Sequence, residues 1–222
     1  MLDGLYATFI EDGRWEWFLS GLGYTLLISL FAVLIGLILG VLAAFGRLSR
    51  IKPVKWIAGI YIDVIRGTPT MVQVLIIYYV IFASVNLPAW IVGVIAFSIN
   101  SGAYISEIVR GGILSINIGQ TEAGRSLGLT QVQTMRYIIM PQAMKNILPA
   151  LANEFIVLIK ETAVIGMVNN VDLLGAAKKV QTLTYDFLWP LLSCAAIYYI
   201  IIKILTILLS KLEARMRKSD KR

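Results

Sequence analysis

Long stretches without any charge alternate with short basic segments along this chain. No charged residue lies between Trp17 and Gly46, or between Gly67 and Ser106. A helix that crosses the hydrocarbon core of a bilayer needs roughly 20 apolar residues. The first stretch therefore predicts one membrane span. The second is long enough for two, with a turn between them marked by Asn86, Pro88 and Trp90.

Two further apolar stretches follow a polar interruption at residues 111–143. The first contains Glu154, Lys160 and Glu161, which is unusual for a span, and the second is apolar except for Lys203 near its end. A mixed loop at residues 166–186 separates them. The pattern predicts an all-α membrane protein with a single transmembrane domain over residues 1–222. The five expected spans lie at about 18–46, 69–85, 89–110, 145–165 and 187–210.

Basic residues gather in the loop at 47–55, in the polar segment at 111–143 and in the tail at 211–222. With five spans all three segments lie on one side of the membrane, and the excess of Lys and Arg identifies that side as the cytoplasm. The N-terminus, with four acidic residues against Arg14, then lies outside. Its acidic character is also unlike that of a secretory signal peptide. A short amphipathic helix is expected after the first loop, ending near Asp63–Arg66.

Composition supports a membrane protein and excludes several kinds of site. Hydrophobic residues make up 58% of the chain and charged residues 15%, and the mean hydropathy is +0.79. Soluble domains usually carry about 25% charged residues. The net charge of +7 lies in segments that flank apolar stretches, so we expect a lipid bilayer and no nucleic acid as partner. Without histidine and with Cys194 alone, a Cys/His zinc site, His-based catalysis and an internal disulfide are excluded.

A repeat of small residues occurs in the first expected span. Gly36, Gly40 and Ala44 recur at every fourth position and so lie on one helix face. Such a face predicts close packing against a neighbouring helix, and a dimer interface is the alternative.

The polar segment between the third and fourth spans predicts a helical hairpin. Leu127, Leu129, Val132 and Met135 follow a spacing near the helical period, Gly128 interrupts it, and Pro141 should end or kink it. Two short helices meeting at a glycine are expected on the cytoplasmic face. An amphipathic hairpin of this kind either lies in the lipid headgroups or docks into a partner protein. The low number of basic residues favours a protein partner.

The same segment resembles the EAA loop of the membrane subunits of ATP-binding-cassette importers. The family pattern is Glu-Ala-Ala, then Gly, then Ile-x-Leu-Pro at fixed spacing. The chain departs from it at Gly124, in place of the second Ala, and at Met140, in place of Leu. The resemblance implies that this loop, at about 119–143, is the coupling helix that sits in a cleft of the ATPase. The matching positions, which we expect to carry the coupling, are Glu122, Ala123, Gly124, Gly128 and Pro141.

Other motifs are similar to the polar amino-acid permeases within this family. They are Arg66-Gly67-Thr68-Pro69, Ala103-Tyr104 through Glu107, Arg110-Gly111-Gly112 and Lys160-Glu161-Thr162. The resemblance covers nearly the whole chain and implies a multi-pass subunit of a bacterial inner membrane importer that works by alternating access. It also implies a cytoplasmic ATPase dimer that holds ATP and Mg²⁺, an extracytoplasmic substrate-binding protein and a second permease subunit, either an identical copy or a paralogue.

One short segment imitates a nucleotide-binding motif. Residues 119–126 resemble a phosphate-binding P-loop with Arg125 in place of Lys, but a true P-loop follows a buried strand. Here the preceding segment is an expected span. We therefore predict that this chain is not itself an enzyme and carries no cofactor, so that ATP hydrolysis belongs to a separate subunit.

Ionisable and amide side chains within the expected spans are the candidates for substrate contact. Polar groups within a bilayer are costly, so their presence in a span indicates a function. Glu154 and Glu161 are seven residues apart in span four and share a helix face, as do Asn100, Tyr104 and Glu107 in span three. Glu107 is expected to be structural, pairing with Arg110 or capping its helix. The predicted substrate-binding residues are Glu154, Glu161, Asn100, Tyr104, Thr70 and Gln73.

Two functions from different classes remain open at the level of sequence. The first is an importer permease for polar, in particular basic, amino acids, for which the acidic side chains supply a cation site. The second is an ion-coupled secondary transporter that uses Glu154 and Glu161 as ion sites, which inverted repeats would favour. No internal repeat is evident in the sequence. Dependence of uptake on a separate ATPase distinguishes the two.

Overall fold

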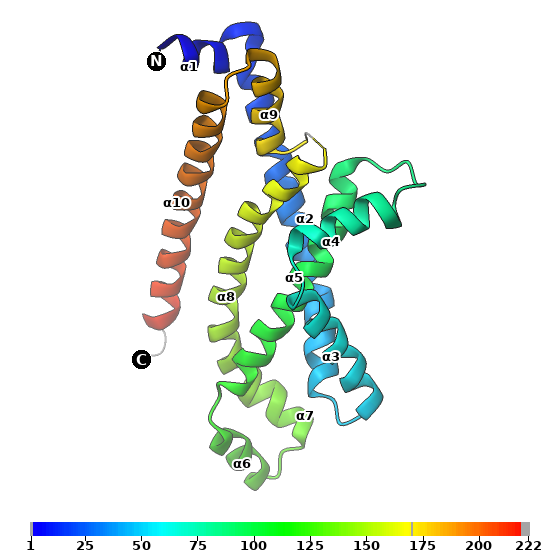
Figure 1. Ribbon diagram of the computed structural model, residues 1–222. Helices are drawn as coiled ribbons and strands as arrows, with labels where there is room; N and C mark the ends of the chain where they lie inside the picture. The colour runs from blue at the N-terminus through cyan, green and yellow to red at the C-terminus, as the bar shows by residue number, and fades with distance from the viewer. Residues whose placement is uncertain (1, 170, 219–222) are drawn as a thin grey trace.

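The computed structural model describes residues 2–169 and 171–218, and all regular elements in these ranges are helices, as predicted (Figure 1). The long helices α2 (Trp15–Leu48) and α10 (Leu188–Lys218) run along the molecule. The helix α8 (Met140–Glu161) lies between them, and α5 (Ala89–Leu114) crosses α2. The remaining elements are α1 (Leu2–Phe9), η1 (Glu11–Gly13), α3 (Lys52–Arg66), α4 (Thr70–Ile76), η2 (Ile77–Ile81), α6 (Ile118–Ser126), α7 (Gln131–Thr134), η3 (Met135–Ile139), η4 (Thr162–Met167) and α9 (Leu173–Thr184).

Three helices are long and apolar enough to cross a membrane unaided. They are Glu11–Leu48, Ala89–Leu114 and Leu188–Ala214, and they match the first, third and fifth expected spans. The second expected span, at 69–85, is not one straight helix. Instead α4 and η2 together hold about 12 residues, or roughly 18 Å of helix. They form one possible crossing only as a pair with α3, from which they are bent by 104°.

The bend between α3 and α4 has a local cause in the sequence. Gly67 ends α3, and Pro69 stands in an extended conformation (φ −64°, ψ 131°) immediately before α4. A residue before proline is disfavoured in the helical region, so the chain leaves the helix at Thr68. The charge-free stretch from 67 to 106 gave no sign of this bend beyond the Gly-Thr-Pro motif itself.

The fourth expected span corresponds to α8, which begins earlier than predicted. It starts at Met140, ahead of residue 145, and passes at Glu161 into the 3₁₀ turn η4. The predicted loop at 166–186 was wrong in one respect, because it contains the helix α9. Asp172 begins α9 by accepting a hydrogen bond from the Gly175 N–H at 2.8 Å. The loop residue Asn170 and the end of the tail beyond 218 lie outside the described residues.

The small-residue face of α2 packs against α5 within the same chain. A Cβ atom placed on Gly40 would lie 2.6 Å from the Ile105 side chain, and one on Gly36 would lie 3.2 Å from the backbone of Gly102. Ala44 is fully buried beside them. These contacts confirm the prediction of close helix packing, because α2 and α5 approach so closely that a Cβ at Gly40 would clash with Ile105.

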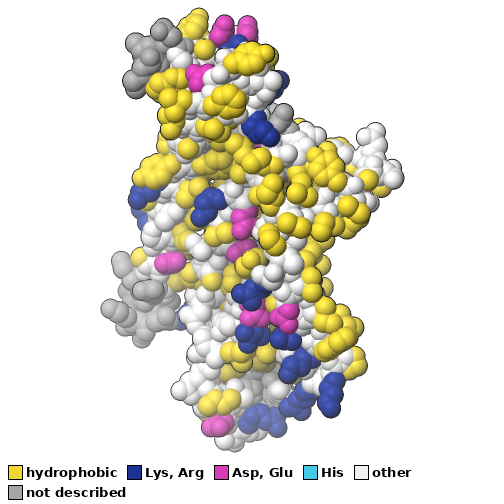
Figure 2. Space-filling view, viewed as in Figure 1, with side chains coloured by type: hydrophobic (Ala, Val, Ile, Leu, Met, Phe, Trp, Pro, Cys, Tyr) yellow, Lys and Arg dark blue, Asp and Glu magenta, His cyan; other side chains and the backbone are white. Residues whose placement is uncertain are grey.

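Opposite ends of the molecule carry different elements. In Figure 1, α6 and α7 lie together at one end, and α1 and α9 lie at the other. In Figure 2, Lys and Arg side chains gather at the end that holds α6 and α7, and apolar side chains cover much of the length between the ends. Large exposed hydrophobic side chains on α2 and α10 include Ile38, Leu42 and Tyr199. Such a surface is suited to lipid or to another apolar protein surface.

Candidate functional site

A half-buried carboxylate lies in the second half of α8, where it faces α5. The Ser101 hydroxyl donates a hydrogen bond to Oε1 of Glu154 at 3.3 Å, and Ser101 itself is fully buried. Within the described chain Glu154 forms no ion pair. A carboxylate has about four lone-pair positions, so Glu154 retains most of its capacity to accept hydrogen bonds from a ligand.

Three other predicted site residues form a separate cluster between α4 and α5. The side-chain amide of Asn100 donates to Oε1 of Gln73 at 2.8 Å and to the Thr70 hydroxyl at 3.4 Å. Gln73 in turn donates to the Ile65 carbonyl at 2.7 Å and to the Thr68 hydroxyl at 2.7 Å. These bonds satisfy polar groups freed by the bend between α3 and α4 and connect α4 to α5.

Asn100 and Ser101 are neighbours in sequence but serve different clusters. Asn100 faces α4 whereas Ser101 faces α8, because consecutive helical residues point about 100° apart. The structure thus brings Asn100, Thr70 and Gln73 together, and places Glu154 on another side of α5. The side-chain amide of Gln73 forms all its hydrogen bonds within the protein, so its role in this conformation is structural.

The other two predicted substrate contacts lie further along the same helices. Glu161 is the last residue of α8, about 10 Å along the axis from Glu154, and is half-buried. Tyr104 of α5 lies beneath Arg66, whose guanidinium carbon is 5.4 Å from the ring centroid. Tyr104 therefore borders a charged region of α3 and α5, and it lies three residues along α5 from Ser101.

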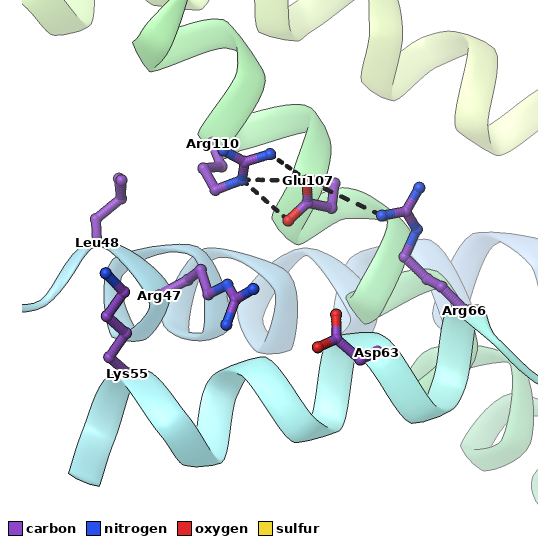
Figure 3. Close-up of a pocket in the computed structure, with 7 residues that line it drawn as sticks. All are labelled: Arg47, Leu48, Lys55, Asp63, Arg66, Glu107 and Arg110. Carbon is purple, nitrogen blue, oxygen red and sulfur yellow. Dashed lines mark hydrogen bonds and ion pairs between the residues drawn. The ribbon is translucent and has the colours of Figure 1, made fainter. Parts of the chain in front are cut away.

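Glu107 pairs with Arg110, which confirms the structural role expected of it. Its carboxylate receives hydrogen bonds from Arg110 at 3.0 and 2.6 Å, and Arg66 approaches it at 3.9 Å (Figure 3). The Arg110 contact joins adjacent turns of α5, and the Arg66 contact reaches across to α3. Glu107 is therefore occupied by arginine side chains on the far side of Tyr104 from Asn100.

The predicted hairpin is present as α6, α7 and η3, with Gly128 at the turn. Gly128 has a φ of +82°, a backbone conformation that side chains with a Cβ rarely adopt. Thr130 then begins α7 with a reciprocal capping box. Its hydroxyl accepts a hydrogen bond from the Gln133 N–H at 3.2 Å, and its own N–H donates to Oε1 of Gln133 at 2.8 Å. The segment that imitates a P-loop is helix α6, and it follows helix α5.

Gly124 has a packing reason to depart from the family pattern. A Cβ at this position would lie 2.8 Å from Cγ2 of Thr134 and 2.9 Å from Cδ1 of Ile138. Gly124 is buried where α6 crosses α7 and η3, whereas Glu122 and Ala123 are exposed. The hairpin is therefore tightly closed on its inner side and presents Glu122, Ala123 and the 79%-exposed Leu127 on its outer side.

Pro141 lies where the hairpin meets α8, at the position where the sequence predicts an end or a kink. The π-helical turn η3 runs directly into α8, and Pro141 is the second residue of α8. The change from a π-helical to an α-helical turn occurs at Met140. Pro141 therefore marks the junction between hairpin and α8.

Two groups of functional interest were missed by the sequence reasoning. Ser101 lacks any sequence signal, because its partner Glu154 is 53 positions away. Asp172 falls in the segment at 166–186 that the sequence predicts as a mixed loop, but it is fully buried, and burial raises its pKa to about 6. Among the described residues no group of three or more His, Cys, Asp or Glu side chains is placed to hold a metal ion.

Comparison with known proteins finds relatives along nearly the whole chain. The chain is 38% identical over 200 residues to a putative glutamine transport system permease protein of Rickettsia typhi, covering 89% of this chain and 92% of the relative. It is 38% identical over 204 residues to the arginine transport system permease protein of Bacillus subtilis, covering 91% and 93%. A crystal structure of an amino acid ABC transporter with histidines matches with a TM-score of 0.86 and 46% identity over 90% of this chain and 94% of that one.

The family assignment rests on most of the sequence. Residues 36–218, from the middle of α2 to the end of α10, match the family described as binding-protein-dependent transport system inner membrane component. The matched range includes the hairpin at α6 and α7 and the Ser101–Glu154 pair. This chain belongs to the family of inner membrane components of binding-protein-dependent transport systems.

Proposed function

We propose that this chain is the permease subunit of an ATP-driven importer that moves polar, in particular basic, amino acids inward by alternating access. The observation that carries the proposal is the Glu154 carboxylate, held in the second half of α8 by one hydrogen bond from Ser101 and without a cationic partner in the described chain. An ionised carboxylate within a membrane span is costly unless it binds a cation. A cationic amino acid supplies one.

The relatives support an amino acid but do not agree on which. The two permeases that are 38% identical are named for glutamine and for arginine, both polar and of similar length. Glu154 suits the guanidinium or α-ammonium group of such a ligand, and Glu161 lies on the same helix about 10 Å further along. We propose Glu154 as the direct contact and Glu161, Asn100 and Tyr104 as bordering residues, with Thr70 and Gln73 supporting Asn100.

We further propose that the hairpin transmits the work of a separate ATPase. Its outer face offers Glu122 and Ala123, and its inner face is locked by Gly124 and by the turn at Gly128. A closed hairpin that leads directly into α8 at Pro141 connects a docking surface to the helix that carries Glu154. ATP and Mg²⁺ belong on the partner ATPase dimer, which would grip this hairpin from the cytoplasm.

The proposed membrane topology has five crossings with the N-terminus outside. The crossings are α2, the bent pair of α3 with α4 and η2, then α5, α8 and α10. This places α6 and α7 in the cytoplasm, at the end where basic side chains gather (Figure 2). Delivery by an external binding protein then occurs at the end of α1 and α9. An ion-coupled secondary transporter, the alternative left open by the sequence, is not favoured by the relatives.

Reconstitution tests this function directly. The chain and its ATPase subunit, placed in proteoliposomes with the binding protein on the substrate side, should take up arginine only when hydrolysable ATP is present on the ATPase side. Uptake that continues with a non-hydrolysable analogue and follows a proton or sodium gradient would instead support the secondary transporter.

A further inference from the structure

A cavity of about 450 Å³ lies at the end of α2, between α3 and α5, and is separate from the Ser101–Glu154 pair (Figure 3). Its lining holds more basic than acidic side chains and so has an excess of two positive charges. The residues are Arg47, Lys55, Arg66 and Arg110 against Asp63 and Glu107, with Leu48.

Two of the four cations in this cavity are already paired and two are not. Glu107 accepts hydrogen bonds from Arg110 and lies 3.9 Å from Arg66. Arg47 and Lys55 make neither an ion pair within 4 Å nor a hydrogen bond with any residue that the structure describes. In Figure 3 the guanidinium of Arg47 extends over α3 into the space between α2, α3 and α5. Arg47 interacts with the Glu107 carboxylate only at longer range, so Arg47 and Lys55 have no directly bonded partner and are available to an anion.

The position of Arg47 is fixed by packing. A Cβ on Gly59 would lie 2.2 Å from Nη1 of Arg47, so the arginine rests directly on the backbone of α3 at a glycine. Arg47 is half-buried, whereas Lys55 is exposed at the mouth. A guanidinium held in place loses little side-chain entropy when it binds a ligand, and its fork matches two oxygens of a phosphate.

The other face of α3 is apolar and exposed. Trp56 is 70% exposed and Ile57 65%, and Val64 lies about two turns further along the helix. Lys55 and Arg66 lie on the side that lines the cavity. A helix with a lipid-suited face beside a basic cavity, and with tryptophan at its start, is placed at the boundary between hydrocarbon and headgroups.

We propose that this cavity binds the phosphate of an anionic phospholipid headgroup, with Arg47 and Lys55 as its cationic contacts and the acyl chains along the exposed face of α3. The choice of the inner leaflet rests on the proposed topology. Anionic lipids attract basic residues beside a span, and basic pockets between transmembrane helices on the cytoplasmic side are suited to lipid headgroups. A lipid bound there would join α2 and α3 to α5 at the charged cluster of Glu107.

Lipid retention by the complete transporter tests the proposal. The purified complex of permease and ATPase is titrated with phosphatidylglycerol against a phosphatidylcholine background, and bound lipid is counted by native mass spectrometry. The double variant R47Q/K55Q should weaken phosphatidylglycerol retention by about tenfold or more, since each basic residue near the surface contributes on the order of 1 kcal/mol. The charge-preserving variant R47K/K55R should retain the lipid, and Lys211→Gln on α10 should match the wild type.

Each result has a definite meaning. Equal phosphatidylglycerol retention by R47Q/K55Q and by the wild type overturns the proposal. Displacement of the lipid by millimolar inorganic phosphate, or the same affinity for phosphate alone, overturns the lipid as the ligand and leaves an anion site. If R47Q/K55Q does not fold, Lys55→Gln alone replaces it, because Lys55 is exposed and makes no contact that the fold needs. ATP-driven uptake by the wild type in phosphatidylcholine liposomes checks the proposed function independently.

Discussion

Glu154 gives the sharpest test at the scale of a single residue. Glu154→Gln keeps the size and the hydrogen bond to Ser101 but removes the charge. Loss of one partner of a buried charge pair costs about 2–5 kcal/mol, so the affinity for arginine should fall by roughly thirtyfold or more while that for glutamine changes little. Uptake and binding by the reconstituted transporter measure both.

A matched control for this change lies at the start of α2. Glu16 is exposed and lies far along the sequence from α5 and α8, and Glu16→Gln removes the same charge. It should leave the affinity of the transporter for arginine unchanged. If Glu154→Gln also leaves affinity and uptake unchanged for every cationic amino acid, the assignment of Glu154 is wrong.

Asp172 predicts a dependence of stability on pH. Burial raises its pKa to about 6 from an ordinary value of 3.8, so the folded state favours the protonated form. The stability this contributes is fully present below about pH 4 and is lost as the pH rises through about 6, by an amount on the order of 1–3 kcal/mol. Asp172→Asn keeps an oxygen to accept the Gly175 N–H. As the pH rises from 4 to 7, the melting temperature of Asp172→Asn in detergent should therefore rise relative to that of the wild type. A difference that stays constant with pH would contradict this.

At the scale of elements, the turn at Gly128 should control coupling. Its φ of +82° is unfavourable for a β-branched residue, and no atom lies within 4 Å of a Cβ placed there, so a substitution acts through the backbone alone. Gly128→Val should reduce arginine uptake strongly while ATP hydrolysis continues, because the hairpin no longer holds its angle. Gly128→Asn should retain much of the uptake, since asparagine tolerates this conformation. Fully coupled transport by Gly128→Val would exclude a coupling role for the turn.

The crossing of α6 with α7 makes a second prediction at this scale. Gly124→Ala restores the residue typical of the family and gains about 1 kcal/mol of helix propensity. Overpacking against Thr134 and Ile138 costs about 1–3 kcal/mol, so the variant should be less stable overall. The double variant G124A/T134A removes the nearest clash and should recover both melting temperature and uptake. A single variant as stable as the wild type would show that the hairpin relaxes freely.

The elements differ in how far the sequence could reveal them. Charge-free stretches set the extents of α2, α5 and α10, because hydrocarbon excludes charge over a fixed thickness. The helix α9 was missed because its mixed sequence has no long apolar stretch. The burial of Asp172 depends on its contacts with Gly21 of α2 and Tyr198 of α10, which are distant in sequence. The bend before α4 was equally hidden. It depends on the hydrogen bond that the Gln73 side chain donates to the carbonyl of Ile65. The spacing of apolar residues along the sequence does not indicate such a bond.

The same limit applies to the candidate site. The sequence placed Glu154 and Asn100 on neighbouring spans, since the spacing of charges and amides within each span can be counted. It did not separate them into two clusters, because the direction in which Asn100 and Ser101 point follows from how α5 packs between α4 and α8. Pairing across 53 residues is a property of the folded chain alone.

At the scale of the whole molecule, one copy does not enclose a pathway. Glu154 and Glu161 are only half-buried, and a single chain would leave them beside hydrocarbon, which is costly. We expect a second permease subunit to face them and complete a polar passage, and a two-fold pair of identical chains is the simplest closed arrangement. We therefore predict a complex of two copies of this 24.6 kDa chain with two ATPase subunits.

Co-expression of tagged and untagged copies with the ATPase tests this prediction, because purification by the tag should also recover the untagged copy. Native mass spectrometry of the same complex should give two permease masses of this chain. A complex that assembles and transports only when a different permease chain is present would show instead that the facing wall comes from a paralogue.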